Sequence, residues 1–201
     1  MAAGADEPIR REPPDLRGLS LADIARLAAE RRLPPVETWN PPDCGHSGMR
    51  IDRSGTWWHA GSPIGRPALV RLFSTILRRE PDGRFVLVTP VEKLAIDVED
   101  APFLAVEAMS EGEGRERRIA FRLATDDLVI AGPDHPLRFA AGADGAPRPY
   151  LHVRGAAPWP LEALVARPVF YELAAWALAE QEAQGGPLGL WSDGAFFAFP
   201  T

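Results

Sequence analysis

Cysteine is almost absent from this sequence. The 201 residues include one, Cys44, so no disulfide can form within the chain. Such low cysteine usage fits a reducing compartment. The first residues, MAAGADEPIRREPPD, are polar and lack the apolar core of a signal peptide. We therefore expect a cytoplasmic protein.

Long apolar runs and an excess of positive charge are absent too. No apolar run approaches the roughly 18 residues of a transmembrane helix, so we expect no contact with a membrane. The 22 Lys and Arg against 28 Asp and Glu give a net charge of -6 and a pI near 5.3. A nucleic acid polymer binds to clustered positive charge, and we expect no such partner.

Residue patterns typical of enzymes and cofactor sites are missing as well. The sequence contains no phosphate-binding loop, no GxGxxG and no GxSxG. Cys44 and His46 lie close together, but His59, His135 and His152 are scattered and give no zinc spacing. We predict no metal and no cofactor, we assign no catalytic residue, and we favour a protein that is not an enzyme.

The chain does contain enough apolar sequence for a core. Hydrophobic residues make up 46%, while 21 Pro and 18 Gly indicate many turns and short elements. Residues 1–19 mix Pro, Arg and acidic residues and predict a flexible arm. Residues 20–92 predict an N-terminal α+β domain, and residues 93–201 predict a C-terminal β-rich domain with one long helix.

Turns and periodicity predict the elements of the first domain. A helix begins at the N-cap Ser20 with SLADIARLAAERRL, and the Pro-rich loop PPVETWNPPDCGHSGMRID follows. Two short strands flank the turn at Gly55, and a second helix begins at Pro67, because proline suits the first helical turn. Residues 85–89 predict a buried strand, and residues 94–99 predict a half-exposed strand that we place at a sheet edge.

The second domain is predicted to be mostly β. Residues 103–153 hold short alternating strands between turns, which predicts an antiparallel meander that curls into a partial barrel. A helix is predicted over residues 161–184, and a final hairpin joins residues 188–191 to residues 195–199. The fold class is therefore α+β, with two packed halves that meet near residues 89–103.

A helix-turn-strand pattern occurs twice. RPALVRLFSTIL begins at Arg66 and RPVFYELAAWAL begins at Arg167, and their apolar positions align. Each helix is followed by an Asp-Gly turn and a strand, DGRFVLVTP in the first copy and DGAFFAFP in the second. Amphipathic helices before such turns also arise by chance, but the shared Arg-Pro start favours an internal duplication.

Three blocks carry a family resemblance: PPVETWNPPDCGHSGMRI, GTWWHAGSPIGRPALVRLFSTILRRE and DGRFVLVTPVEKLAIDVEDAPF. From Ser20 to the C-terminus the chain resembles the proteobacterial domain of unknown function 1285 family. The matching positions are Trp39, Cys44, Gly45, Trp57, Gly61, Ile64, Arg66, Leu69, Phe73, Thr89, Pro90, Glu92, Asp100, Pro102 and Phe103.

This resemblance implies a two-domain fold that arose by duplication, with a C-terminal half similar to pleckstrin-homology barrels. It also implies a groove between the halves that binds a nucleotide-type ligand, and a role in signal transduction. No enzymatic activity is established for the family, so it supplies no catalytic residue.

The two Arg-Pro helix starts are the first candidate ligand site. A residue that precedes proline is kept out of the helical region, so Arg66 and Arg167 each lie just before a helix. The free N–H groups and the dipole of that helix attract an anion, which an arginine would also bind. The alternative is an internal ion pair with the acidic side chains of residues 92–100.

The segment TPVEKLAIDVEDAPF, which begins at Thr89, is the second candidate. Asp97 and Glu99 share a strand face, as paired acidic groups require, but the exposed face of an edge strand explains them more simply. Polar contacts to a ligand are predicted from Thr89, Glu92, Lys93 and Asp100.

The third candidate is the strand that holds Trp57, Trp58 and His59. Neighbouring strand residues point to opposite faces, so at most one tryptophan joins the core. The other tryptophan is either a stacking surface for a flat ring or a cover for the domain interface. His59 is a candidate proton carrier, yet no Ser or Cys lies at a diagnostic spacing from it.

Together these features predict a non-catalytic binding or regulatory module with a nucleotide-type anion in the cleft between its halves. The first alternative is a protein-interaction adaptor that uses an exposed sheet edge of the second half. The other alternative is an enzyme that uses acidic residues or His59 near the cleft. A protein partner is compatible with either binding role.

Overall fold

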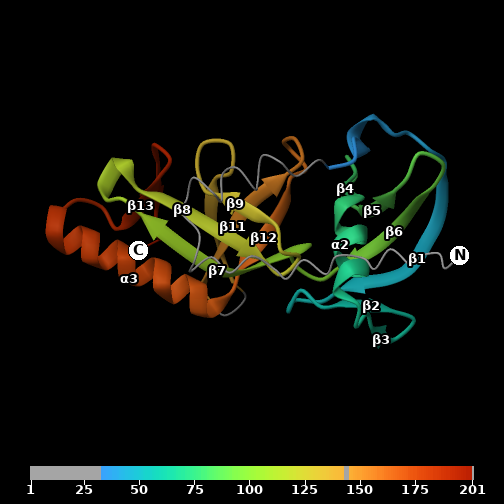
Figure 1. The fold of residues 1–201 in the computed structure, drawn as a ribbon, viewed down its shortest axis with the longest axis horizontal. Helices are drawn as coiled ribbons and strands as arrows, with labels where there is room; N and C mark the ends of the chain where they lie inside the picture. The colour runs from blue at the N-terminus through green and yellow to red at the C-terminus, as the bar shows by residue number, and fades with distance from the viewer. Residues whose placement is uncertain (1–32, 143–144, 201) are drawn as a thin grey trace, which may run out of the picture.

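The computed structural model describes residues 33–142 and 145–200. The predicted N-terminal arm and the helix predicted from Ser20 lie outside these ranges. The described residues form sheet A and sheet B, each of six strands, the two-stranded sheet C and two α-helices. Sheets A and B lie side by side along the long axis of the molecule, with α2 against sheet A and α3 along sheet B (Figure 1).

Each half contributes one of the two large sheets. The first half consists of η2 (Val36–Thr38), β1 (Asp43–Ile51), β2 (Trp57–His59), β3 (Ser62–Pro63), α2 (Pro67–Thr75), β4 (Leu77–Arg79), β5 (Phe85–Val88) and β6 (Lys93–Val98). The second half consists of β7 (Phe103–Glu111), η3 (Gly114–Glu116), β8 (Arg118–Leu123), β9 (Leu128–Ile130), β10 (Leu137–Ala141), β11 (Pro147–Arg154), β12 (Leu161–Val165), α3 (Arg167–Gln184), β13 (Gly189–Ser192) and β14 (Ala195–Ala198).

The two large sheets have the same strand order. Sheet A runs β3-β2-β1-β6-β5-β4, and sheet B, taken from its β9 edge, runs β9-β8-β7-β12-β11-β10. In each sheet one meander leads outward from the centre and a second meander returns to it. The two meanders meet in a parallel pair, β1 with β6 and β7 with β12, while every other pairing is antiparallel. This order confirms the α+β fold of two related halves.

The helices do not follow the sheet correspondence. α2 lies between the third and fourth strands of sheet A, whereas α3 follows the sixth strand of sheet B. After α2 the hairpin β4–β5 is part of sheet A, but after α3 the hairpin β13–β14 forms the separate sheet C. The helix-hairpin repeat in the sequence therefore matches α2, β4 and β5 with α3, β13 and β14. The repeat of the sheets instead matches β1–β6 with β7–β12.

Both helices begin at an Arg-Pro pair, but only Arg66 lies before its helix as predicted, because Arg167 is itself the first residue of α3, after the N-cap Ala166. Arg66 is extended, with φ -109° and ψ 101°, and Pro67 opens α2, in keeping with the proline ring disfavouring a helical conformation for the residue before it. Pro168 likewise lies in the first turn of α3. The inner side of α3 buries Val169 and Leu173 against sheet B.

The predicted helix start at residue 161 was wrong. Residues Leu161–Val165 form β12, which pairs with β7 on one side and β11 on the other. Their side chains alternate between buried and half-buried, the pattern of a strand with one face in a core. The helix begins later, at Arg167, where the Arg-Pro pair sets it.

Strand β1 also begins earlier than predicted, inside the segment expected to be a loop. Gly45 and Gly48 adopt positive φ angles of 97° and 72°, which permit the two register shifts between β1 and β6. Strand β6 lies between β1 and β5 and is not an edge strand. We expected the second half to begin at residue 93, but β6 (Lys93–Val98) is part of sheet A.

Side chains from both halves hold the junction together. The Arg154 guanidinium, from β11, donates to the Ser74 carbonyl oxygen and, at 3.4 Å, to that of Leu77. The Ser74 oxygen lies in the last turn of α2, and Leu77 begins β4 just beyond it. That turn has no basic residue of its own, so Arg154 supplies the positive charge that a helix C-terminus favours. The guanidinium also lies 5.3 Å from the centre of the Phe103 ring.

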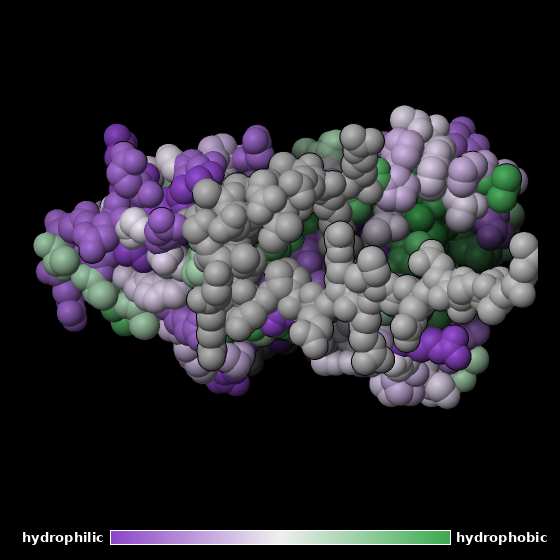
Figure 2. Space-filling model, viewed as in Figure 1, coloured by the Kyte–Doolittle hydropathy of each residue, from purple (hydrophilic) through white to green (hydrophobic). Residues whose placement is uncertain are grey.

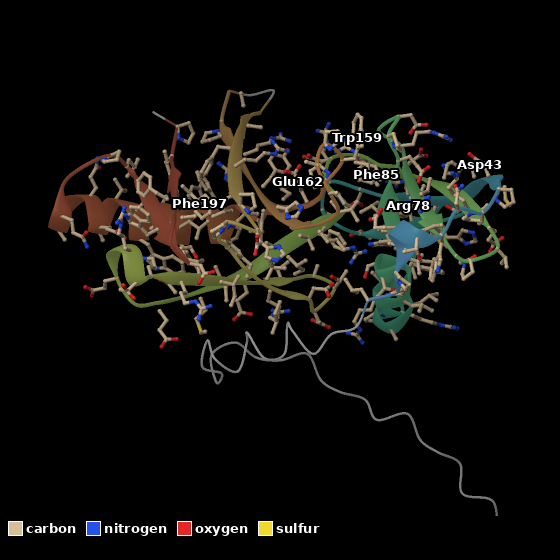
Figure 3. All side chains as sticks on the ribbon, turned by 90° about the horizontal axis from the view of Figure 1, so that it is seen from above. Asp43, Arg78, Phe85, Trp159, Glu162 and Phe197 are labelled. Atoms are coloured by element: carbon tan, nitrogen blue, oxygen red, sulfur yellow. The ribbon has the colours of Figure 1, made fainter. Side chains whose placement is uncertain are left out.

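Two further contacts cross the junction. Arg71 of α2 forms an ion pair with Asp126 in the β8–β9 turn. The Arg79 guanidinium lies 5.1 Å from the ring centre of Phe85 and 5.5 Å from that of Trp159. Figure 3 shows Trp159 and Phe85 close together at this point. The halves are therefore joined by charge at α2 and by stacked side chains beside β5.

Replacing Arg154 with methionine tests the first of these contacts. Arg154→Met keeps apolar packing on Phe103 but leaves two carbonyl oxygens without this donor, so we expect a loss of about 2 kcal/mol in the free energy of unfolding. Urea denaturation followed by tryptophan fluorescence measures it. Arg84→Met, which removes an exposed ion pair, is the matched control and should leave the urea midpoint unchanged. Equal losses in both variants would contradict the capping role.

Candidate functional site

A pocket of about 270 Å³ lies at the junction and is lined by both halves. The first half contributes residues 33–37 and Thr75, and the second half contributes Arg154, Gly155 and Ala156. The walls are mainly apolar, but Glu37, Thr75 and Arg154 add a carboxylate, a hydroxyl and a guanidinium. Pockets of this kind between packed units are the usual place for a small ligand.

Local hydrogen bonds fix the wall formed by residues 33–37. The Val36 N–H donates to the Pro34 carbonyl oxygen at 2.8 Å. The Arg78 guanidinium donates at 2.7 Å to the carbonyl oxygens of both Val36 and Trp39. A buried arginine that binds two main-chain oxygens holds a short turn firmly, so this wall has a defined position.

The opposite wall is the start of the β11–β12 loop. Gly155 has φ 84°, and a Cβ there would lie 3.3 Å from the Trp159 carbonyl oxygen. Both facts favour glycine at this position. The loop can therefore fold back tightly behind Ala156, which leaves room for the pocket.

Arg78 is in turn held by a buried charge cluster with Glu80 and Lys93. The Arg78 and Lys93 nitrogens lie 2.6 and 3.0 Å from the Glu80 carboxylate, and all three side chains are at most 14% exposed. Burial raises the pKa of Glu80, but the hydrogen bonds from Lys93 and Arg78 and the charges of both outweigh it. The pKa of Glu80 therefore lies below its ordinary value of 4.5.

A second polar cluster surrounds Asp100, in the connection between β6 and β7. Asp100 accepts hydrogen bonds from the Tyr150 hydroxyl at 2.8 Å and from Arg148 at 3.1 Å. Burial raises the pKa of the Tyr150 hydroxyl, and the hydrogen bond to Asp100 raises it further. The Arg138 guanidinium lies 4.4 Å from the Tyr150 ring centre and binds Glu162 through two nitrogens. Asp100 thus ties the connection to sheet B.

The predicted tryptophan site divides between the two faces of β2. Trp57 is 2% exposed and stacks on Phe73, with ring centres 6.4 Å apart. Trp58 is half-buried on the other face, where its indole N–H donates to Asp52 at 2.8 Å and the Arg50 guanidinium lies 4.6 Å from its ring centre. His59 is exposed at the end of the strand.

The other predicted residues lie apart from the junction pocket. Arg66 is exposed and its side chain does not cap α2, while Arg167 donates to the Tyr171 hydroxyl at 2.8 Å. The two helices start well apart, in different halves (Figure 1). Thr89 and Glu92 share the β5–β6 turn, where the Thr89 hydroxyl accepts from the Glu92 N–H at 3.2 Å.

None of the nine predicted ligand residues lines the junction pocket, so their ligand role stays a prediction. The residues that do line it carry weak sequence signals. Pro34-Pro35 marks a turn, and Arg154-Gly155 ends an alternating strand before a Pro-rich loop. These signals predict loops but do not indicate that the two loops meet.

Two acidic residues, Asp97 in β6 and Glu99 just after it, face basic partners on β1. Glu99 lies 2.9 Å from Arg50, and Asp97 lies 3.4 Å from His46. Within residues 33–142 and 145–200, no three His, Cys, Asp or Glu side chains gather as they would around a metal ion. In the same part of the chain no helix is long and apolar enough to span a membrane.

The fold defines a class of duplicated α+β proteins with two similar six-stranded sheets. A family model for the N-terminal domain of DUF1285, a domain of unknown function, matches residues 34–101. The model for the C-terminal domain of DUF1285, a protein of unknown function, matches residues 102–199. The chain belongs to the DUF1285 family. The division between the models falls in the connection between β6 and β7.

Two solved structures resemble this chain. A crystal structure of a DUF1285 family protein from Silicibacter pomeroyi DSS-3 is 46% identical with a TM-score of 0.75, over 89% of this chain and 94% of that one. One from Shewanella baltica OS155 is 23% identical with a TM-score of 0.48, over 65% of this chain and 92% of that one. None of the curated proteins compared with the chain matches it.

The lowered pKa of Glu80 predicts how the stability contributed by this carboxylate, which holds Arg78 at the wall of the pocket, changes with pH. Glu80→Gln should lower the free energy of unfolding by about 2 kcal/mol at pH 7, because Arg78 and Lys93 lose their shared carboxylate. A carboxyl group whose pKa is lowered by folding stabilises the folded protein, and this stabilisation is complete at pH values above the pKa of the group in the unfolded chain. That stabilisation disappears as the pH falls through the folded pKa.

The difference between wild type and Glu80→Gln should therefore be constant above about pH 4.5 and shrink below it. Urea denaturation at a series of pH values measures this difference. Glu92→Gln, an exposed glutamate in the neighbouring turn, serves as the control and should show no such loss. A difference that persists undiminished at low pH would contradict the role assigned to Glu80.

Proposed function

We propose that the protein is a non-catalytic regulatory module that binds a nucleotide-type ligand in the junction pocket and acts in signal transduction. The observation that carries the proposal is that one pocket is lined by both halves and includes Arg154, the side chain that joins them. A ligand there would contact α2, the turn at Val36 and the β11–β12 loop together. Binding would therefore alter how firmly the halves are held.

The side chains of the pocket suit a ring that carries an anionic group. Pro34, Pro35 and Ala156 offer apolar surface to the face of a flat ring. Arg154 offers positive charge to a phosphate, and arginine matches phosphate geometry well. The Glu37 carboxylate is an acceptor for an exocyclic amine. A purine nucleotide supplies all three groups.

The volume of the pocket limits the size of the ligand. About 270 Å³ lies just below the range of roughly 300–1,000 Å³ that is common for drug-sized ligands. A mononucleotide, or the base and one phosphate of a larger molecule, fits this size. We therefore expect mononucleotides to bind before dinucleotides.

A titration with adenosine and guanosine monophosphates tests the proposal. A mononucleotide at about a hundred times its dissociation constant should stabilise the fold by roughly 2.7 kcal/mol, which a thermal-shift assay detects. Ala156→Phe places a ring in the pocket without removing any polar group, and it should weaken binding about tenfold or more. Isothermal titration calorimetry measures the change.

The matched control is Ala198→Phe, the same substitution at an exposed residue of β14, which should leave the affinity unchanged. Glu37→Gln should weaken an aminopurine more than inosine monophosphate, which lacks the exocyclic amine. Binding that survives Ala156→Phe would place the ligand outside this pocket. Failure of every mononucleotide to bind would favour the protein-interaction adaptor.

A further inference from the structure

The outward side of α3 is unusually apolar for a surface helix. Its inward side buries Val169, Leu173 and Ala177. On the opposite side Tyr171 is 56% and Leu178 is 50% exposed. A surface helix normally presents polar side chains there. Figure 2 shows apolar surface along the lower left edge of the molecule, where Figure 1 places α3.

The exposed stripe lies along one line of the helix. Arg167, Tyr171, Leu178 and Glu182 follow each other at spacings of one or two turns, and Ala175 lies between the two apolar residues. All five residues are exposed. The stripe begins with a positive charge, continues with apolar side chains and ends with a negative charge. The Arg167 Nε donates to the Tyr171 hydroxyl at 2.8 Å, which holds the guanidinium beside the stripe.

This order of residues is complementary to itself when a second α3 lies antiparallel to the first. An alignment that sets Arg167 opposite the partner's Glu182 also sets Tyr171 opposite the partner's Leu178. The same alignment brings Ala174 opposite the partner's Ala175 at the centre. Small residues at the crossing point let two helices approach closely. One two-fold arrangement therefore pairs opposite charges, apolar side chains and small residues at the same time, as a symmetric dimer requires.

We propose that the outward face of α3 is a homodimer interface, occupied by the α3 helix of a second copy of this chain. The two-fold axis passes beside Ala174 and Ala175. Two Arg167–Glu182 ion pairs flank the contact, and two Tyr171–Leu178 contacts fill it. The interface lies on the far side of sheet B from sheet A (Figure 1), so it does not depend on the junction pocket or on any ligand there.

A single pair of helices buries less surface than a standard interface of about 1,600 Å², so we expect a dissociation constant on the order of micromolar. Sedimentation velocity from about 1 to about 100 µM protein should show a reversible monomer–dimer equilibrium. Leu178→Asp should shift this equilibrium to monomer across the range. A wild-type protein that stays monomeric at about 100 µM would overturn the proposal.

Charge exchange distinguishes this interface from any other dimer. Arg167→Glu and Glu182→Arg each place like charges opposite one another, so each variant alone should dissociate at least about tenfold more readily. Both changes suit the helix dipole, because they put acid at the start and base at the end of α3, so folding is retained. When the two variants are mixed, both contacts again join opposite charges, one with the original sign and one with the signs exchanged, and a heterodimer should form.

A disulfide tests the position of the two-fold axis. Ala175→Cys in a Cys44→Ser background should form a linked dimer under mild oxidation, since the two copies of residue 175 lie near the axis. Val91→Cys in the same background is the control, because Val91 is 76% exposed but far from α3 in the chain. Equal cross-linking of both variants would overturn the proposal, as would a dimer that is insensitive to the charge variants.

Discussion

The end of α2 needs a positive charge that its own sequence does not supply. Its last turn contains no basic residue, and the charge comes from Arg154 in the other half of the chain. Because the same guanidinium covers Phe103, where β7 begins, one side chain touches α2, β7 and β11. The same side chain lines the junction pocket, so Arg154 contributes at once to the docking of the halves, to the stability of α2 and to the proposed ligand site.

Local features of the fold were predictable because their causes are local. Proline suits the first turn of a helix, and Pro67 and Pro168 lie there in α2 and α3, while Asp-Gly turns set the hairpins that follow the two helices. The strand order was not predictable, since the pairs β1 with β6 and β7 with β12 join segments far apart in the sequence. The same reason explains the error at Leu161–Val165, which becomes identifiable as a strand only when β7 lies beside it.

The candidate site was even harder to predict from the sequence, because it also depends on contacts between segments that are far apart in the chain. A helix start attracts anions, which makes Arg66 and Arg167 candidates, and both helices do start there, but in different halves. The charge of Asp100 makes it a candidate for a ligand contact, but its carboxylate binds Tyr150 and Arg148 of sheet B. The junction pocket draws on residues around Val36 and on Gly155, which carry no pattern typical of a ligand site. Their proximity results from docking of the halves, and no spacing within the sequence encodes it.

The parallel pair at the centre of each sheet has a mechanical consequence. In each large sheet the first and last strands lie side by side and point the same way, so the chain enters the sheet at one end of the pair and leaves it at the other. Tension along the chain therefore pulls these two strands past each other, and the hydrogen bonds between them are loaded in shear, all at once. A pair pulled apart from one end would instead lose its bonds one after another. Each large sheet is consequently arranged to resist stretching.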